Sequence, residues 1–220
     1  MKIKYLIVLF SVLGISLLYC CAQFSKPALV NLHELPEYEG KQVIVQGIVS
    51  RYYTTTYGGQ LITIQTANSS QPEFSAIVFT ESPIEVEYGD IIQASGEVQR
   101  YQNQWEITTQ TEQDITIVSK WQNISFPFWQ LAENPQRYTG INVNITGLID
   151  RVYDTYFYLI DDTEDYCIMV TVDYDEKENI SQGNHVNIQG LFTYDIENMR
   201  YIIEVTDPSH GIVYYREEKQ

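Results

Sequence analysis

The stretch GKQVIVQGIVSRYY at residues 40–53 lies over GINVNITGLIDRVY at residues 140–153 without a gap. The identical positions are two glycines, a valine, an arginine and a tyrosine: Gly40/Gly140, Val43/Val143, Gly47/Gly147, Arg51/Arg151 and Tyr53/Tyr153. Further on, GDIIQASG at residues 89–96 lies over GNHVNIQG at residues 183–190. The change in spacing between the two matches falls where turns and loops absorb length. The chain therefore holds two copies of one domain.

Each copy has the pattern of β-strands. From Ile141 to Ile149, apolar side chains alternate with polar ones, which is the period of a half-buried strand. Further strands are expected near 61–65, 74–79, 91–98 and 105–109, and near 156–160, 166–172, 186–192 and 199–205. Glycines in mid-strand indicate a bend, a bulge or close packing, and they lie at Gly47, Gly96, Gly147 and Gly190. Five strands per copy predict a small Greek-key barrel.

Three motifs carry a resemblance to a known family. They are Gly-x-x-Val-x-Val-x-Gly-x-Val at residues 40–49 with its counterpart at 140–149, Phe-Tyr-Leu-Ile-Asp-Asp at residues 157–162, and Gly-Asp/Asn-x-Val/Ile-x-x-x-Gly before the fourth strand. Both copies resemble the OB-fold, the oligonucleotide/oligosaccharide-binding barrel. The resemblance implies an all-β protein with two tandem five-stranded barrels. The helix that is usual between the third and fourth strands is replaced here by loops at 80–88 and 173–182.

The first 23 residues have a different character. Lys2 and Lys4 precede an apolar run from Tyr5 to Ala22, which fits either a signal peptide or an N-terminal membrane anchor. Cleavage after Ala22 and acylation of one of the cysteines at 20 and 21 are the alternative fates of this leader. We therefore expect a signal or anchor at 1–23, a first OB-fold domain at 27–119 and a second at 124–217. The expected location is extracytoplasmic, either membrane-anchored or secreted.

Composition narrows the function classes. The formal net charge of −16 becomes −18 if the leader with its two lysines is removed, and this sign argues against a general binder of phosphate backbones. A chain with 18 Tyr, 8 Phe and 3 Trp is not disordered. Without the leader, Cys167 is the single cysteine, and we expect it to be a small buried apolar side chain.

The candidate ligand-binding residues follow from the resemblance. The family binds ligands on its second and third strands and in the loops between strands one and two and strands four and five. Aromatic and arginine side chains occupy these regions, namely Arg51, Tyr53, Tyr57, Tyr101 and Trp105 in the first copy and Arg151, Tyr153, Tyr156, Tyr158 and Tyr194 in the second. They suit stacking on bases or sugar rings. The alternative is that tyrosine simply favours strands and cross-strand pairs.

No catalytic set can be assembled from the sequence, so we expect a binding protein and not an enzyme. We expect no cofactor and no metal site, because the acidic loops at 161–165 and 173–176 read as solvated turns and lack the pattern of a calcium-binding loop. The expected partner is an envelope protein or a glycan, with the membrane contacted through the N-terminal segment. Single-stranded nucleic acid is the alternative ligand, disfavoured by the charge. A spacer without a ligand is the third hypothesis.

Overall fold

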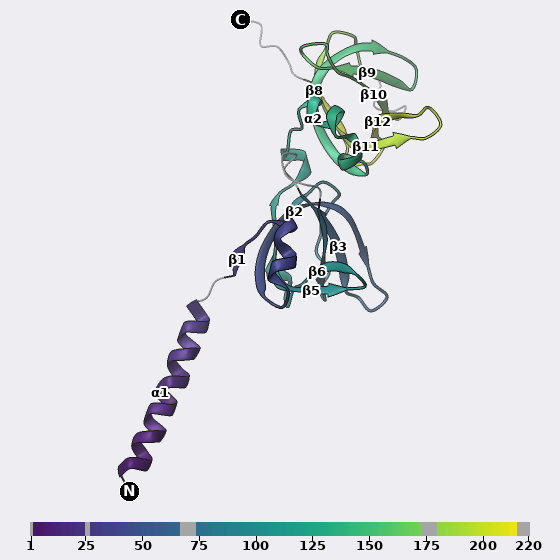
Figure 1. Cartoon of the computed structure of the whole chain (residues 1–220). Helices are drawn as coiled ribbons and strands as arrows, with labels where there is room; N and C mark the ends of the chain where they lie inside the picture. The colour runs from purple at the N-terminus through teal and green to yellow at the C-terminus, as the bar shows by residue number, and fades with distance from the viewer. Residues whose placement is uncertain (1, 25–26, 67–73, 173–179, 215–220) are drawn as a thin grey trace, which may run out of the picture.

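The computed structural model describes residues 2–24, 27–66, 74–172 and 180–214. It consists of a long N-terminal helix followed by two β-barrels that lie one after the other along the chain (Figure 1). The expected tandem arrangement is confirmed, because the two barrels have the same order of strands. The domain boundaries themselves stay predictions.

The first barrel is a closed sheet of five strands. Its strands run in the order β2-β3-β4-β6-β5, and β5 pairs back with β2. All neighbours are antiparallel except β4 and β6, which are parallel. The bounds are β2 Gln42–Thr54, β3 Gln60–Gln65, β4 Ser75–Thr80, β5 Ile91–Tyr101 and β6 Gln104–Thr108.

The second barrel repeats this arrangement. Its order is β8-β9-β10-β12-β11, with β11 adjoining β8 and β12, and its one parallel pair is β10 with β12. The bounds are β8 Ile141–Val152, β9 Tyr156–Ile160, β10 Cys167–Val172, β11 His185–Asp195 and β12 Arg200–Val205. A five-stranded Greek-key barrel of this connectivity is an OB-fold. The predicted short strands agree with these bounds to within about two residues, as is usual for assigned ends, whereas the long strands β2, β5, β8 and β11 end three to five residues later than predicted.

Short strands extend both sheets. β1, Ala28–Leu29, pairs with β2 in parallel, and β7, Ile115–Ser119, pairs with β5. In the second barrel, β13, Gly211–Tyr214, pairs with β11 in the same way as β7 pairs with β5. The duplication thus includes the strand that follows the barrel.

The mid-strand glycines mark places where two strands touch. A Cβ on Gly96 would lie 2.5 Å from the Thr108 carbonyl oxygen, and a Cβ on Gly190 would lie 2.6 Å from that of Glu204. A Cβ on Gly147 would lie 2.5 Å from the Ile160 carbonyl oxygen, and one on Gly47 would lie 2.9 Å from that of Gln65. Close packing is therefore the reason for these glycines. The β-bulges lie elsewhere, because the register shifts between Val49 and Arg51 and again between Ile149 and Arg151.

Each barrel is preceded by a short helical segment that enters its core. In the first copy this is a 3₁₀ helix, η1 Leu32–Tyr38, whose Leu32 and Leu35 are buried in the apolar cluster of the barrel. In the second copy, α2 Phe128–Glu133 and α3 Pro135–Tyr138 contribute Phe128, Leu131 and Tyr138 to the corresponding cluster. Both segments add apolar helical surface to the core of their barrel. In the first barrel, residues 80–88 between the third and fourth strands form no helix, as expected. The corresponding loop of the second copy lies largely outside the described residues.

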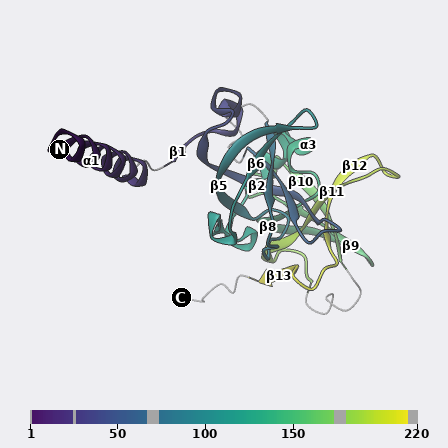
Figure 2. The ribbon, with the colours of Figure 1, turned by 90° about the horizontal axis from the view of Figure 1, so that it is seen from below.

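The N-terminal segment forms the helix α1, Lys2–Phe24. Figures 1 and 2 show it apart from both barrels, and its described apolar side chains are exposed. No helix among the described residues is long and apolar enough to cross a membrane. The membrane-anchor alternative therefore gains no support from the structure, and export stays a prediction.

The two barrels meet in a packed joint. Ile48 of β2 is buried in the apolar cluster of the second barrel. Arg137 Nη2 donates to the Thr66 carbonyl at 2.7 Å, and Gln65 Nε2 donates to the Arg137 carbonyl at 2.7 Å. The linker between the barrels contains the 3₁₀ helix η3, Trp121–Asn123. In this helix, the fully buried Trp121 donates its indole N–H to a carboxylate oxygen of Glu87 at 2.6 Å. These contacts fix one barrel against the other.

The turn before the last strand of each copy is closed by a different side chain. In the first copy, Asp114, the last residue of η2 Glu112–Asp114, accepts hydrogen bonds from the backbone N–H groups three and four residues earlier. In the second copy, His210 Nδ1 accepts from the N–H groups at the same two positions, at 3.2 and 3.3 Å. The His210 Nε2 lies 3.2 Å from Asn142 Oδ1, and the ring packs edge-on against Trp121. A titratable side chain thus lies beside the joint.

Candidate ligand-binding faces of the two barrels

The first barrel has a groove of about 660 Å³ on the face that the family resemblance singled out. Its walls come from the β2–β3 loop and from the end of the β5–β6 hairpin. Its floor is the outer surface of β3, β4 and β6. The lining residues are Thr55, Tyr57, Gly59, Leu61, Phe79, Glu81, Gln99, Tyr101, Glu106 and Thr108.

Two aromatic rings stand at the walls. Tyr57, at the tip of the β2–β3 loop, is 99% exposed, and Tyr101 of the hairpin is 57% exposed. The loop is closed by a hydrogen bond from Thr55 N to the Gly59 carbonyl at 2.6 Å. The hairpin turns through Gln102 and Asn103, both with positive φ, which is the geometry of a tight two-residue turn. Short, well-defined turns therefore present both rings to solvent.

The floor contains a buried carboxylate. Glu106 of β6 is only 5% exposed. Gln99 Nε2 donates to its Oε1 at 2.5 Å, and the Thr108 hydroxyl donates to the same oxygen at 3.4 Å. Burying a carboxylate is costly unless a charge partner or several hydrogen bonds compensate, so this residue calls for a functional explanation.

The second barrel has a different surface on its corresponding face. The Arg151 guanidinium lies over the Tyr158 ring at 4.7 Å from the centroid. Tyr153 and Tyr156 are stacked with centroids 4.7 Å apart, and both rings contact Tyr158 edge-on. Arg200 Nη1 donates to the Tyr158 hydroxyl at 3.4 Å. These side chains form what we call the tyrosine cluster of the second barrel: Arg151, Tyr153, Tyr156, Tyr158 and Arg200.

The structure divides the predicted ligand-binding residues into groups. Tyr57 and Tyr101 line the groove, while Arg51 and Tyr53 are exposed on β2 outside its lining. The remaining residues of the second copy, apart from Tyr194, belong to the tyrosine cluster. Tyr194 lies apart from that cluster, in edge contact with the Tyr201 ring. Their roles in binding stay predictions.

Trp105 lies beside the β5–β6 turn, as expected, but outside the lining of the groove. In the structure it is half-buried, packs against the apolar cluster of the first barrel, and carries the Arg100 guanidinium over its ring at 5.6 Å. The hairpin pairs Arg100 with Trp105, and the next pair is Gln99 with Glu106. Because side chains alternate along a strand, this register turns Glu106 outward to the groove and Trp105 away from it.

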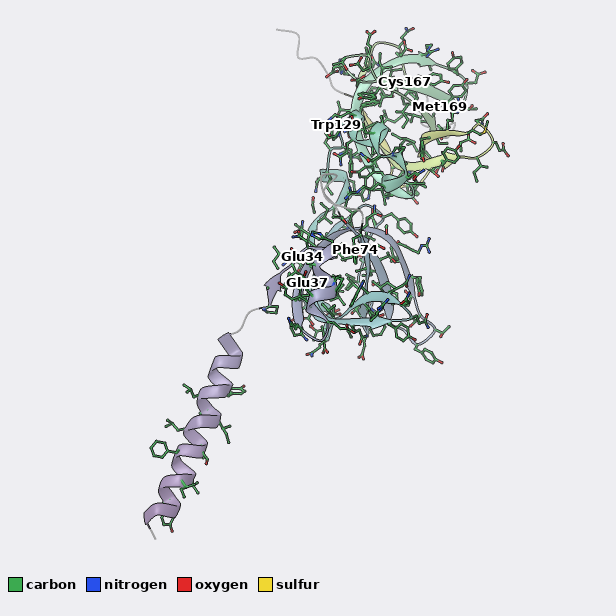
Figure 3. All side chains as sticks on the ribbon, viewed as in Figure 1. Glu34, Glu37, Phe74, Trp129, Cys167 and Met169 are labelled. Atoms are coloured by element: carbon green, nitrogen blue, oxygen red, sulfur yellow. The ribbon has the colours of Figure 1, made fainter. Side chains whose placement is uncertain are left out.

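The expectation that Cys167 is buried is wrong. The residue is exposed at the start of β10, on the second barrel (Figure 3). Along β10 the apolar cluster takes Val170 and Val172, so the alternate position 167 faces outward. Partial burial nevertheless raises the pKa of the Cys167 thiol.

The groove residues Glu106, Glu81 and Gln99 could not be identified from the sequence. A glutamate in a strand of a very acidic chain carries no signal by itself. The repeat offers a hint, because the second copy has the apolar Ile202 at the position equivalent to Glu106. Among the acidic loops, that at 161–165 is a turn in which Asp161 accepts from the Tyr166 N–H, and 173–176 lies outside the described residues. No cluster of three metal-binding side chains occurs within the described part of the chain.

No family model and no curated protein matches this sequence. Among solved structures, it is similar to a murine DNA-binding protein bound to double-stranded DNA (11% identity, 81% of this chain and 98% of that chain, TM-score 0.33). It is also similar to the second OB-fold domain of replication protein A from Methanococcus maripaludis (20% identity, 41% and 97%, TM-score 0.29). The asparaginyl-tRNA synthetase from Pyrococcus horikoshii is a third (18% identity, 49% and 27%, TM-score 0.33).

The chain thus spans about a quarter of that synthetase. At these TM-scores the likenesses support no argument of their own. The assignment of two OB-folds rests on the strand order and pairing of each barrel.

Proposed function

We propose that the protein is a non-catalytic binding module and that the groove of the first barrel is its main ligand site, for a protein or a glycan. One observation carries the proposal: exposed aromatic rings on two tight loops border a concave surface whose floor holds a buried carboxylate. Concave surfaces with a few converging polar groups are typical ligand sites. Tyrosine rings contribute contact area at low entropic cost and stack on sugars as well as on peptide side chains.

The test is a titration of the ¹⁵N-labelled protein with a panel of soluble probes. A neutral glycan (cellotetraose) and short basic and neutral peptides would be added while amide shifts are recorded. We expect a saturable response centred on residues 55–59 and 99–106 for at least one probe. The double variant Tyr57→Ala, Tyr101→Ala abolishes it, and the control Tyr194→Ala leaves it. A response that survives the double variant, or no response to any probe, contradicts the proposal.

A second candidate is single-stranded nucleic acid, bound on the tyrosine cluster of the second barrel. The observation that favours it is the placement of two arginines, Arg151 and Arg200, around stacked tyrosine rings. Aromatic platforms beside cations are how sequence-tolerant proteins hold unstacked bases. The acidic chain opposes this binding through long-range repulsion.

Its test is the binding of oligo-dT at about 10 mM salt, where charge attraction is least screened. The expected result is affinity that disappears in the variant Arg151→Gln, Arg200→Gln and stays in the control Arg51→Gln, Arg100→Gln, which removes two exposed arginines from the first barrel. Absence of binding to the unaltered protein at this salt removes the candidate.

We also propose that the module acts outside the cytoplasm. The support is the sequence of the leader, two lysines followed by an apolar run, which is typical of an export signal. Intact-mass measurement of the protein purified from its cells tests this. A mass that lacks the leader, or that carries a lipid, supports export; an unmodified full-length mass in the soluble cell contents contradicts it.

A further inference from the structure

The buried carboxylate of Glu106 lacks a cationic partner in the part of the chain that the structure describes. Both of its hydrogen bonds reach one oxygen, Oε1, from the Gln99 amide and the Thr108 hydroxyl. No ion pair joins Glu106 to a lysine or arginine among the described residues. The second oxygen, Oε2, thus has no hydrogen-bond partner among the described residues, and it belongs to a residue that lines the groove and is only 5% exposed.

The fold does not need a carboxylate at this position. Glu106 pairs with Gln99 on one side and with Ile77 on the other. In the second barrel, the residue with the same two pairings is Ile202, which is also 5% exposed. The position opposite, Gln99, becomes Thr193. The apolar version of this site exists in the same chain, so the charged pair is a specific feature of the first barrel.

The rest of the groove favours a positive charge. Its lining contains a second carboxylate, Glu81, at the exposed rim, and neither lysine nor arginine. The nearby Arg100 is turned away, because its guanidinium lies over Trp105 and donates to Asn103 Oδ1. Tyr57, Phe79 and Tyr101 add aromatic surface around the carboxylates. Aromatic faces and carboxylates together are the environment that attracts ammonium and guanidinium groups.

Resting on the proposed function of the groove, we propose that its ligand is a basic protein segment that inserts a lysine or arginine side chain toward Glu106. The cation supplies the charge partner that the carboxylate lacks, and its N–H groups bond to Oε2. The aliphatic stem lies between the Tyr57 and Tyr101 rings. The net charge of −16 attracts such a segment from a distance and raises its rate of association.

The experiment measures binding of fluorescein-labelled heptalysine to the full chain, with a Gly-Ser heptapeptide as the neutral probe. Glu106→Gln keeps the volume and removes the charge, and Glu106→Ile installs the residue that the second barrel carries. The matched control is Glu204→Gln, which removes one charge from the equivalent face of the second barrel. Thermal unfolding confirms that each variant is folded.

We expect heptalysine to bind at about 10 mM salt, and both Glu106 variants to weaken its binding by about tenfold or more. Glu204→Gln changes it by less than about twofold. Equal losses in all three variants mean attraction by bulk charge alone and overturn the inference, as does a lack of heptalysine binding to the unaltered protein.

The result also separates this inference from the proposed function. If cellotetraose or the neutral peptide binds, and the binding needs Tyr57 and Tyr101 but is unchanged in Glu106→Gln, the groove is a ligand site without charge recognition. The inference then fails and the proposed function stands. If the double tyrosine variant changes the binding of no probe, the groove itself is wrong and both fail.

Discussion

The two barrels share a frame and differ on their outer faces. Positions that face inward are apolar in both, and the glycines at the strand contacts are kept at 47, 96, 147 and 190. Positions that face outward have diverged. Where the first barrel has Leu61 and Thr63 on its second strand, the second has Tyr156 and Tyr158, and Glu106 is replaced by Ile202. One barrel therefore keeps an open acidic groove, whereas the other covers its face with rings that pack on one another.

The largest change in stability is expected when the second barrel is given a glutamate at the position equivalent to Glu106. Ile202→Glu places a carboxylate at a 5% exposed site, opposite Thr193 and without a glutamine donor. We expect a loss of about 4 kcal/mol of unfolding free energy at neutral pH, because the charge is buried without compensation. Urea unfolding measures it. The control Ile202→Val should cost about 1 kcal/mol. A loss no larger than that of the control means that the two sites are not equivalent.

A second prediction treats the shared frame. Gly96→Ala and Gly190→Ala each push a methyl group to about 2.5 Å from a carbonyl oxygen of the neighbouring strand. We expect each to destabilise its own barrel by about 2–3 kcal/mol, since the strands cannot separate without losing hydrogen bonds. Gly211→Ala, with open space around its Cβ, serves as the control and should be nearly neutral. Unequal effects of the two substitutions in urea unfolding would show that the frames differ.

The third prediction concerns the stability that the first barrel loses by burying Glu106 in the groove. Glu106→Ile should raise the unfolding free energy by about 1 kcal/mol, because a buried carboxylate is exchanged for the apolar residue found in the second barrel. The measurement is urea unfolding at neutral pH without ligand. Destabilisation instead would show that Glu106 is a structural residue of the first barrel, and that the comparison with Ile202 misleads.

The smallest effect is a pH dependence of stability that distinguishes the turn closed by His210 from the turn closed by Asp114. Burial lowers the pKa of His210, so the unfolded chain binds a proton more readily than the folded one below about pH 6.5. The unfolding free energy should therefore fall as the pH drops from 7 to 5.5. His210→Asp, which copies the turn closed by Asp114, removes this slope, because a carboxylate there titrates at lower pH. The unaltered protein and the variant are compared by urea unfolding at both pH values; identical slopes contradict the assignment.

The sequence predicts the frame well and the faces poorly, for a physical reason. Alternation and the repeat locate the strands, because inward positions must be apolar and the close contacts must be glycine. The register of the β5–β6 hairpin cannot be deduced in the same way, and a shift of one residue exchanges Trp105 with Glu106. The sequence therefore does not show which of these two side chains faces the groove. Exposed Cys167 illustrates the same limit, since a small apolar residue is tolerated on either side of a strand.

The joint at Trp121 has a consequence for any partner that touches both barrels. The linker indole is bonded to Glu87 of the first barrel and packs against His210 of the second, and Arg137 donates to Thr66 across the joint, so the two faces keep one relative orientation. A molecule that spans them meets a fixed spacing and orientation, and gains from double engagement only if its own geometry matches. The fixed joint thus selects among such partners by their dimensions as well as by their chemistry.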